Sequence, residues 1–464
     1  MSAVTAKVKM SKGDMIKWFF TLVLPLLIAA IPINDVFTMP MKLFLSSTLM
    51  AILCFAFEIV PQTAVALILP IFWVFFNVAP ANVVFQPWTQ YNVWMMFSGL
   101  LMANVLESTG LLSRIAYFCI LKTGATYNGI LFGLAGAGFI ISMTIGHAVV
   151  PMAALTYGIC LALDLKLCKE SAGIMLVGAM SCLVVNMAKF TAPVLMMGIG
   201  ESITGPLELL GFFESWFVNA PLILYFFIMV VIAAIIFRPE RPISGKEYFQ
   251  QKLQDMGKMS TSEKKAAAVI ILYFIFIITG NIHHMSITWG MAFLPLLLIV
   301  PGIGAGTQKD IQRLNYGFVL FITACMGIGS VAGHLNLGNV IVNIVMPHLE
   351  GHGHYTFFMI EWFWLVLCNF VMTPMAMEAA FTIPLATIGT SMGLNPMAVY
   401  YFMTSAVDQI LLPYEYAMYM LFFAFNIIRL KDFVKLMGLK MIVNFIILFA
   451  LLLPWWKLIG FLFA

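Results

Sequence analysis

The stretch YNGILFGLAGAGFIISMTIGHAVVPMAALTYGICLAL, residues 127–163, contains no Asp, Glu, Lys or Arg and one histidine, His147. One crossing of a bilayer core takes about 20 residues, so this stretch is long enough to enter a membrane and return. Lys122 precedes it and Lys166 follows it, and lysines beside spans mark the cytoplasmic side. The pattern predicts a re-entrant hairpin with its tip near His147. A non-helical tip at that depth must line a cavity or be buried in protein.

The rest of the chain has the same character. Of its 464 residues, 62% are hydrophobic and 9% are charged, against about 25% charged in soluble proteins. About ten runs are long enough to span a bilayer, and backbone in lipid must form helices. We therefore predict an all-α polytopic membrane protein with about 11 transmembrane helices and two re-entrant hairpins.

Spacing divides the chain into two similar halves of opposite orientation. Each half has a hairpin followed by a span that a proline interrupts, an inverted repeat typical of secondary transporters. The predicted segments are the N-terminus and first span, 1–41; the first repeat, 42–237, with hairpin 127–163 and broken span 171–200; a polar cytoplasmic linker, 238–265; and the second repeat, 266–464, with hairpin 355–391 and broken span 396–428.

Charge distribution predicts the orientation and argues against several functions. Lysines before the first span place the N-terminus in the cytoplasm, and counting spans places the C-terminus outside, in a plasma (inner) membrane. The net charge of +4 comes from loop residues and implies no nucleic-acid partner. We find no metal-ligand spacing and no nucleophile–base pair, so we expect no metal, no cofactor and no enzyme activity.

Four further stretches resemble the divalent anion–sodium symporters, which carry dicarboxylates, citrate or sulfate. They are LESTGLLSRIAY (106–117), DMGKMSTSEKKAA (255–267), LPLLLIVPGIG (294–304) and NIIRLKDFVKLMGLKMIVNFIILFALLLPWWKLIG (426–460). The resemblance covers most of the chain after about residue 40. It implies an elevator-type movement and a homodimer in the lipid membrane.

The hairpin tips depart from this family. Its members usually carry Ser-Asn-Thr at both tips, where it binds a substrate carboxylate and helps to hold sodium. By alignment the first tip here is Gly146-His147-Ala148, and the second is Pro374-Met375-Ala376, with Glu378 just after it. The coupling ion is therefore Na⁺ or H⁺, and we expect that sodium is not strictly required.

Two sets of candidate site residues follow from the tips, the breaks and the charges within them. The substrate-binding candidates are Gly146, His147, Ala148, Lys189, Thr191, Pro374, Met375, Ala376, Glu378, Pro413 and Glu415. The ion-coupling candidates are Ser142, His147, Glu378 and Asp408.

Each charged candidate has a structural alternative, because an ionisable residue at mid-membrane is expensive and needs a reason. His147 can bind substrate, carry a proton, or only hydrogen-bond backbone at the tip. Lys189 can meet an anionic substrate, replace a lost sodium ion, or pair with Glu378 or Asp408. Asp408 or Glu415 can cap a helix at the break.

The sequence therefore predicts a secondary active transporter of a small organic anion, most simply a di- or tricarboxylate, coupled to an ion or working by exchange. The acidic residues in the second half leave two alternatives open. One is a cation/proton antiporter without an organic substrate, and the other is a carrier of a zwitterionic substrate.

Overall fold

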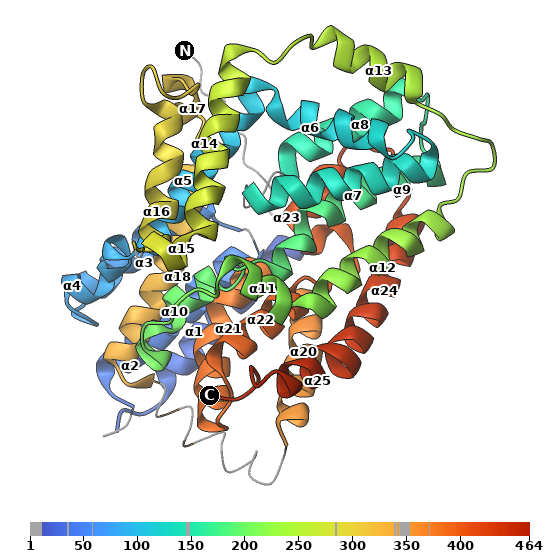
Figure 1. Cartoon of the computed structure of the whole chain (residues 1–464). Helices are drawn as coiled ribbons and strands as arrows, with labels where there is room; N and C mark the ends of the chain where they lie inside the picture. Colours follow the sequence, from blue (N-terminus) through green and yellow to red (C-terminus); the bar gives the residue numbers. More distant parts are fainter. Residues whose placement is uncertain are drawn as a thin grey trace, which may run out of the picture.

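The computed structural model describes residues 12–464 except 35–36, 58, 145–148, 284, 338–339, 341–342, 344–352 and 371. Helices account for most of these residues, as Figure 1 shows. Two isolated β-bridges, Thr126 with Ser244 and Leu394 with Phe463, are the extended pairings found in the described part of the chain. The predicted all-α fold class is confirmed.

The helices before the polar linker are listed first, with η marking short 3₁₀ segments. They are α1 (Lys12–Ala30), α2 (Met39–Phe57), α3 (Gln62–Phe75), α4 (Ala81–Val84), η1 (Gln86–Thr89), α5 (Tyr91–Thr109), α6 (Leu111–Lys122), α7 (Tyr127–Thr144), α8 (Val149–Ala162), α9 (Lys169–Leu183), η2 (Val185–Ala188), α10 (Val194–Thr204), α11 (Phe212–Val218) and α12 (Ala220–Ile236).

The linker and the second half follow, with a π-helical segment labelled η5 near the end. These helices are α13 (Lys246–Asp255), α14 (Thr261–Ile278), α15 (Gly280–His283), α16 (Ile287–Phe293), η3 (Leu294–Ile299), α17 (Gln308–Gln312), α18 (Tyr316–His334), α20 (His354–Asn369), α21 (Pro374–Ser391), α22 (Pro396–Val407), η4 (Pro413–Glu415), α23 (Ala417–Phe423), α24 (Leu430–Ile447), η5 (Leu448–Leu452) and α25 (Leu453–Leu458).

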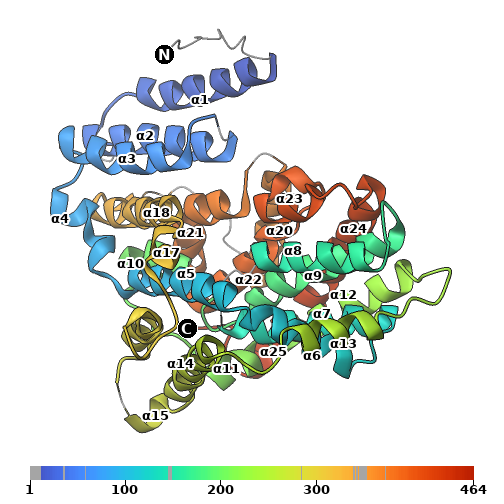
Figure 2. The same ribbon diagram turned by 90° about the horizontal axis from the view of Figure 1, so that it is seen from above.

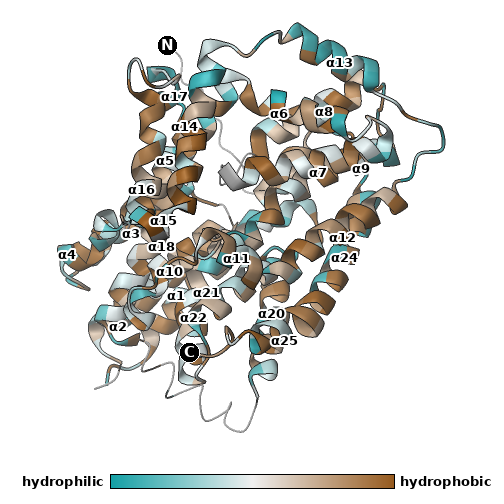
Figure 3. Cartoon of the chain, in the orientation of Figure 1, coloured by the Kyte–Doolittle hydropathy of each residue, from teal (hydrophilic) through white to brown (hydrophobic). Residues whose placement is uncertain are grey.

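Four stretches in the described residues are long and apolar enough to cross a membrane, or up to six if each bent helix pair is one span. Several other apolar helices have only 10–17 described residues. Figure 3 shows the contrast between the apolar helices and the hydrophilic α13 at one edge. The predicted number of about 11 spans therefore stays a prediction.

The arrangement of the first helices is clearest from above. In Figure 2, α1, α2 and α3 lie together on one side, and α18 lies next to α3. α5 and α6 meet at an angle of 70°, where Gly110 has a left-handed backbone with φ 81°. Glycine suits this turn because it has no Cβ to oppose a positive φ.

The first broken span runs through α9, η2 and α10. α9 is buried along almost all of its length, and it ends in the short turn of η2. Lys189 follows with an extended backbone (φ −75°, ψ 144°), and Pro193 is the N-cap of α10. A proline cannot donate the hydrogen bond that would continue the helix. The span is therefore non-helical between residues 189 and 193.

The second broken span has the same plan. α22 ends with Asp408 as its C-cap, and the chain returns to helix at α23. Leu412 and Tyr416 are extended on either side of the short η4. Pro413 is the first residue of η4 and lies inside the break. Apart from η4, residues 409–416 are therefore non-helical between α22 and α23.

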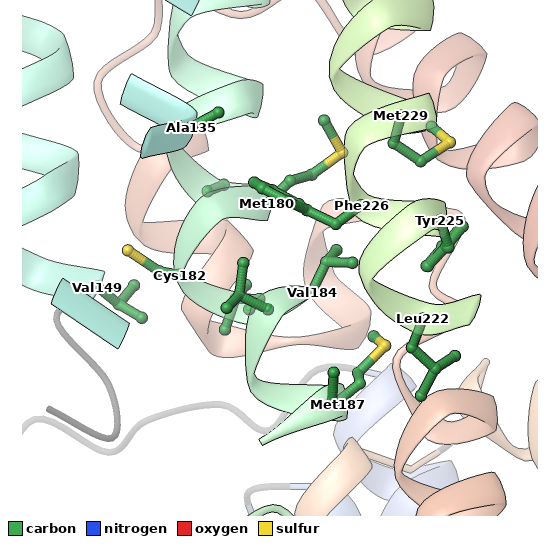
Figure 4. Packing of buried hydrophobic residues seen from close by; sticks show 14 of the residues in the cluster. Ala135, Val149, Met180, Cys182, Val184, Met187, Leu222, Tyr225, Phe226 and Met229 are labelled. Atoms are coloured by element: carbon green, nitrogen blue, oxygen red, sulfur yellow. The ribbon is translucent and has the colours of Figure 1, made fainter. Parts of the chain in front are cut away.

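Small side chains and close contacts hold the interior of the first half. Ser142 of α7 donates a hydrogen bond to the Ser181 carbonyl of α9 at 3.1 Å. Figure 4 shows the packing of α9 and η2 against α12. The labelled residues between the two are Met180, Val184 and Met187 on one side and Leu222 and Phe226 on the other, whereas Cys182 points toward Val149. The first break is thus supported by a dense apolar wall.

α10 and α18 cross with almost no space between them. A Cβ built on Gly329 of α18 would lie 2.7 Å from the carbonyl carbon and 2.8 Å from the Cα of Ile199 in α10. Ser202 of α10 lies against Gly333, one turn along α18. Two small residues four apart are a common way for membrane helices to approach closely. This crossing fixes the helix that begins at the first break.

The end of the linker is tied to the first half by one ion pair. Arg114 of α6 contacts Glu263, at the start of α14, with Nε and Oε1 2.7 Å apart and side chains 15% and 5% exposed. Arg114 also donates to the Gly257 carbonyl at 3.0 Å. Ser260 and Glu263 form a capping box that begins α14. Hydrogen bonding by Arg114 is the main reason that the pKa of Glu263 lies below its ordinary value of 4.5.

Candidate functional site

A cavity of about 220 Å³ lies where the two breaks meet. Its wall comes from both breaks, from the first residues of α21 and from one face of α5, with contributions from α14, α16, η3 and α18. Most of the wall is apolar, and it includes several methionines. Among its described residues, three are charged, namely Lys189, Glu378 and Asp408. A few charged groups on an apolar wall are typical of a small-molecule site.

Lys189 is held in place by its backbone. Its N–H donates to the Asn186 carbonyl at 3.3 Å, and its carbonyl accepts a hydrogen bond from the Tyr401 hydroxyl of α22 at 3.3 Å. Residue 189 as a whole is 6% exposed. Across the residues that the structure describes, its ammonium has no hydrogen bond and no ion pair. A buried charge without a partner is costly, so a bound anion would compensate it.

Two helices begin at the cavity. α10 starts directly after Pro193, and its first residues, Val194 and Leu195, line the wall. α21 starts at Pro374, with the Thr373 hydroxyl as N-cap accepting the Ala376 N–H at 3.4 Å. The N-terminus of a helix carries partial positive charge and unpaired N–H groups. Both helix starts therefore favour an anion in the cavity.

Glu378 belongs to the second turn of α21 and lines the same cavity. Its backbone carbonyl accepts the Thr382 hydroxyl at 2.5 Å. Its carboxyl group has no hydrogen-bond or ion-pair partner among the described residues. The group is therefore free to receive a proton, a cation or a substrate amine from the cavity.

Asp408 has a partner that is not Lys189. The Lys440 ammonium of α24 lies 2.5 Å from Asp408 Oδ2 and also donates to the Asp408 backbone carbonyl. The Lys440 side chain is 0% exposed and that of Asp408 is 9% exposed. Of the two pairings considered for Lys189, the one with Asp408 is thus absent, because Lys440 occupies that carboxylate.

Glu415 serves the backbone of the second break. Its carboxylate accepts the N–H groups of Leu411 and Leu412 at 2.8 and 3.0 Å. Both acceptor oxygens are used, and Glu415 is not among the described residues that line the cavity. The geometry corresponds to the capping alternative for this residue.

The structure brings together part of the predicted site. The predicted residues that line the cavity are Lys189, Thr191, Pro374, Met375, Glu378 and Asp408. Ala376, Pro413, Glu415 and Ser142 are described but are not among the lining residues; Ser142 is bonded within the α7–α9 contact. Gly146, His147 and Ala148 lie outside the described residues.

Lys440 is the charged group that sequence reasoning passed over. Lys440 lies inside the apolar stretch 426–460, and an ionisable residue inside an apolar span is itself a sign of a functional or paired group. Tyr416, Tyr273 and the α5 methionines also line the cavity. Aromatic and methionine residues are common in any membrane helix, so no pattern singled them out.

The chain was compared with known proteins and structures. A family model described as the sodium:sulfate symporter transmembrane region matches residues 12–462. A curated protein named "Membrane protein" from Cupriavidus necator is 26% identical over 291 residues, covering 59% of this chain and 56% of that protein. The chain thus matches just over half of that relative's length.

Two solved structures share the fold. The YdaH transporter of Alcanivorax borkumensis has a TM-score of 0.53 and 14% identity, covering 79% of this chain and 85% of that one. MtrF of Neisseria gonorrhoeae, described with a class of antimetabolite efflux pumps, has a TM-score of 0.56 and 12% identity, covering 83% and 84%. At these identities, the similarity shows a shared helical fold and gives no information about the substrate. With a family model matched over nearly its whole length, the chain belongs to the family of the sodium:sulfate symporter transmembrane region.

Proposed function

We propose that this protein is a secondary active transporter of a small organic anion, most simply a di- or tricarboxylate. The anion binds in the cavity between the two breaks. Transport is coupled to an ion or proceeds by exchange, and it has no strict requirement for sodium. The protein acts as a homodimer in the inner membrane, with its N-terminus in the cytoplasm, and the binding cavity moves across the membrane as in an elevator.

The observation that supports this proposal best is the ammonium of Lys189 in the cavity wall, which has no partner in the part of the chain that the structure describes. The starts of α10 and α21 add partial positive charge on the same cavity. Lysine binds anions as a point charge through up to three donors, so it accepts carboxylates of different shapes. A fixed cation beside two helix starts is an arrangement suited to an anion.

Glu378 supports coupling to a proton. A carboxylate on the same wall as the anion site repels an anion when it is ionised. Protonation removes that repulsion, so proton and anion would enter the cavity together. Transport would then be driven by a pH gradient rather than by sodium.

The experiment is binding and uptake by purified protein in liposomes, using labelled succinate, citrate and sulfate. Lys189→Gln removes one charged hydrogen bond to the substrate, which is typically worth about 1.5–3 kcal/mol. The apparent affinity should therefore fall about 10- to 150-fold. Lys189→Arg keeps the charge and should retain part of the binding. Lys435→Gln, at an exposed position of α24, is the matched control and should bind like the parent.

Two outcomes would contradict the proposal. One is carboxylate uptake by Lys189→Gln with the affinity of the parent. The other is a parent that transports no anion in any gradient.

A second candidate function rests on the shared position of Glu378 and Lys189. Opposite charges on one wall also suit a zwitterionic substrate, and Glu378 alone suits a cation/proton antiporter. An amino-acid substrate would appear in the same uptake screen. Collapse of a pH gradient by sodium alone, without an organic substrate, would identify the antiporter.

A further inference from the structure

Lys440 and Asp408 form a buried contact that the proposed anion site does not use. The ammonium of Lys440 donates to two oxygens of one residue, the Oδ2 carboxylate oxygen at 2.5 Å and the backbone carbonyl of Asp408. The ring centroid of Tyr419 lies 5.6 Å from the same nitrogen, within the range of a cation–π contact. The lysine is fully buried, so water does not complete its surroundings.

The position of Asp408 places this contact at the end of a broken helix. Asp408 is the C-cap of α22, at the point where the second span breaks. The last carbonyls of a helix lack helical partners and carry the negative end of its dipole. In transporters built from inverted repeats, such carbonyls at broken helices hold the coupling cation. The Lys440 ammonium therefore contacts a carboxylate oxygen and a backbone carbonyl oxygen of the type that binds a metal cation in such transporters.

The neighbouring groups support the same interpretation. Glu415 gives both carboxylate oxygens to the Leu411 and Leu412 N–H groups, so its hydrogen bonds serve the backbone of the second break. Asp408 also lines the cavity on its other side. Each break thus meets one lysine. Lys189 lies in the first break, and its ammonium has no partner among the described residues; Lys440 of α24 contacts Asp408 at the second break.

We propose that the Lys440 ammonium is a tethered cation that occupies the cation position at the second break, so that this position takes no sodium ion from solution. The proposal deepens the proposed transport function, since it explains how uptake proceeds without strict sodium dependence. Its test uses no substrate, so it fails or succeeds separately from the anion proposal.

The test is thermal unfolding of the purified protein in sodium chloride and in choline chloride of equal ionic strength. Lys440→Met keeps the length of the side chain but leaves the Asp408 oxygens without a cation. We expect this variant to unfold at least about 2 °C higher in sodium than in choline, because sodium binds only the folded break. The parent and Lys435→Met, on an exposed part of α24, should show no such difference.

The double variant Asp408→Asn with Lys440→Met removes both charges and should lose the sodium response. If Lys440→Met cannot be purified in either salt, Lys440→Gln takes its place, since an amide keeps one donor group without the charge. A folded Lys440→Met or Lys440→Gln protein that is equally stable in both salts would overturn the proposal. So would a sodium response of the same size in the double variant.

Discussion

The close crossing of α10 and α18 makes a sharp prediction for Gly329→Ala. A methyl group at position 329 would lie 2.7 Å from the Ile199 carbonyl carbon and nearer still to its oxygen, whereas ordinary contact begins at 3.4 Å. The obstacle is backbone, so no rotamer change can relieve it. The two helices must separate by roughly 0.7 Å or more at this point, and a gap of that size forfeits a quarter to a half of each dispersion contact.

Overpacking of this kind costs about 1–3 kcal/mol. Glycine to alanine in a helix returns about 0.5–1 kcal/mol through backbone entropy, so the net loss is smaller. The net loss is therefore up to about 2.5 kcal/mol, and we expect Gly329→Ala to lower the unfolding midpoint in detergent by about 1–3 °C. Because α10 begins at the cavity, the same change should also weaken anion binding.

Gly327→Ala in the same helix is the matched control. Its methyl group would lie 3.3 Å from the Val84 carbonyl oxygen, which a shift of a few tenths of an ångström can relieve. It should be neutral or slightly stabilising. The assay is the midpoint of unfolding measured by size-exclusion chromatography after heating. Equal midpoints for the two variants would refute the argument that the α10–α18 distance is set at Gly329.

Three further predictions follow. Replacing sodium by choline at fixed pH should leave most anion uptake intact; loss of nearly all activity would mean that sodium sites are built from other residues. Arg114 holds the pKa of Glu263 below 4.5, so their contact stabilises the protein above that pH and the contribution is lost as the pH falls further. The stability difference between the parent and Arg114→Met should therefore shrink below about pH 4.5, and a difference that stays constant would contradict this. His147→Ala should weaken substrate binding by about 1–3 kcal/mol if the imidazole binds the anion, and His147→Gln should retain part of it; parent-like binding and accumulation in both variants would make the histidine structural.

The general architecture could be predicted because each local signal has a direct physical cause. Apolar runs predict membrane helices, since nothing else satisfies the backbone in lipid. Proline at position 193 ends the first break and proline at position 413 lies inside the second, since proline cannot continue a helix. Charged residues in apolar segments predicted Lys189, Glu378 and Asp408, which do line one cavity. Their roles in binding and coupling stay predictions.

Pairing between distant helices could not be predicted in the same way. Hydropathy reports how one segment meets lipid, and says nothing about which other segment it faces. Asp408 could have met Lys189 or Lys440 on the basis of charge alone, and only the three-dimensional structure selects Lys440. Glu415 looked like a ligand from its charge, but the turn of the backbone brings its carboxylate back to Leu411 and Leu412.

The buried Lys440–Asp408 contact also constrains how the protein is inserted during synthesis. The two residues lie 32 positions apart on different helices, α22 and α24. A lone lysine at the centre of a helix costs about 2.5–3.5 kcal/mol to insert through the translocon, and Lys440 lies near the middle of α24. Because Asp408 emerges first, α22 reaches the membrane before its counter-ion exists. We therefore expect α24 to insert beside a counter-ion that is already present, so that the second half of the chain assembles in the bilayer as a unit rather than helix by helix.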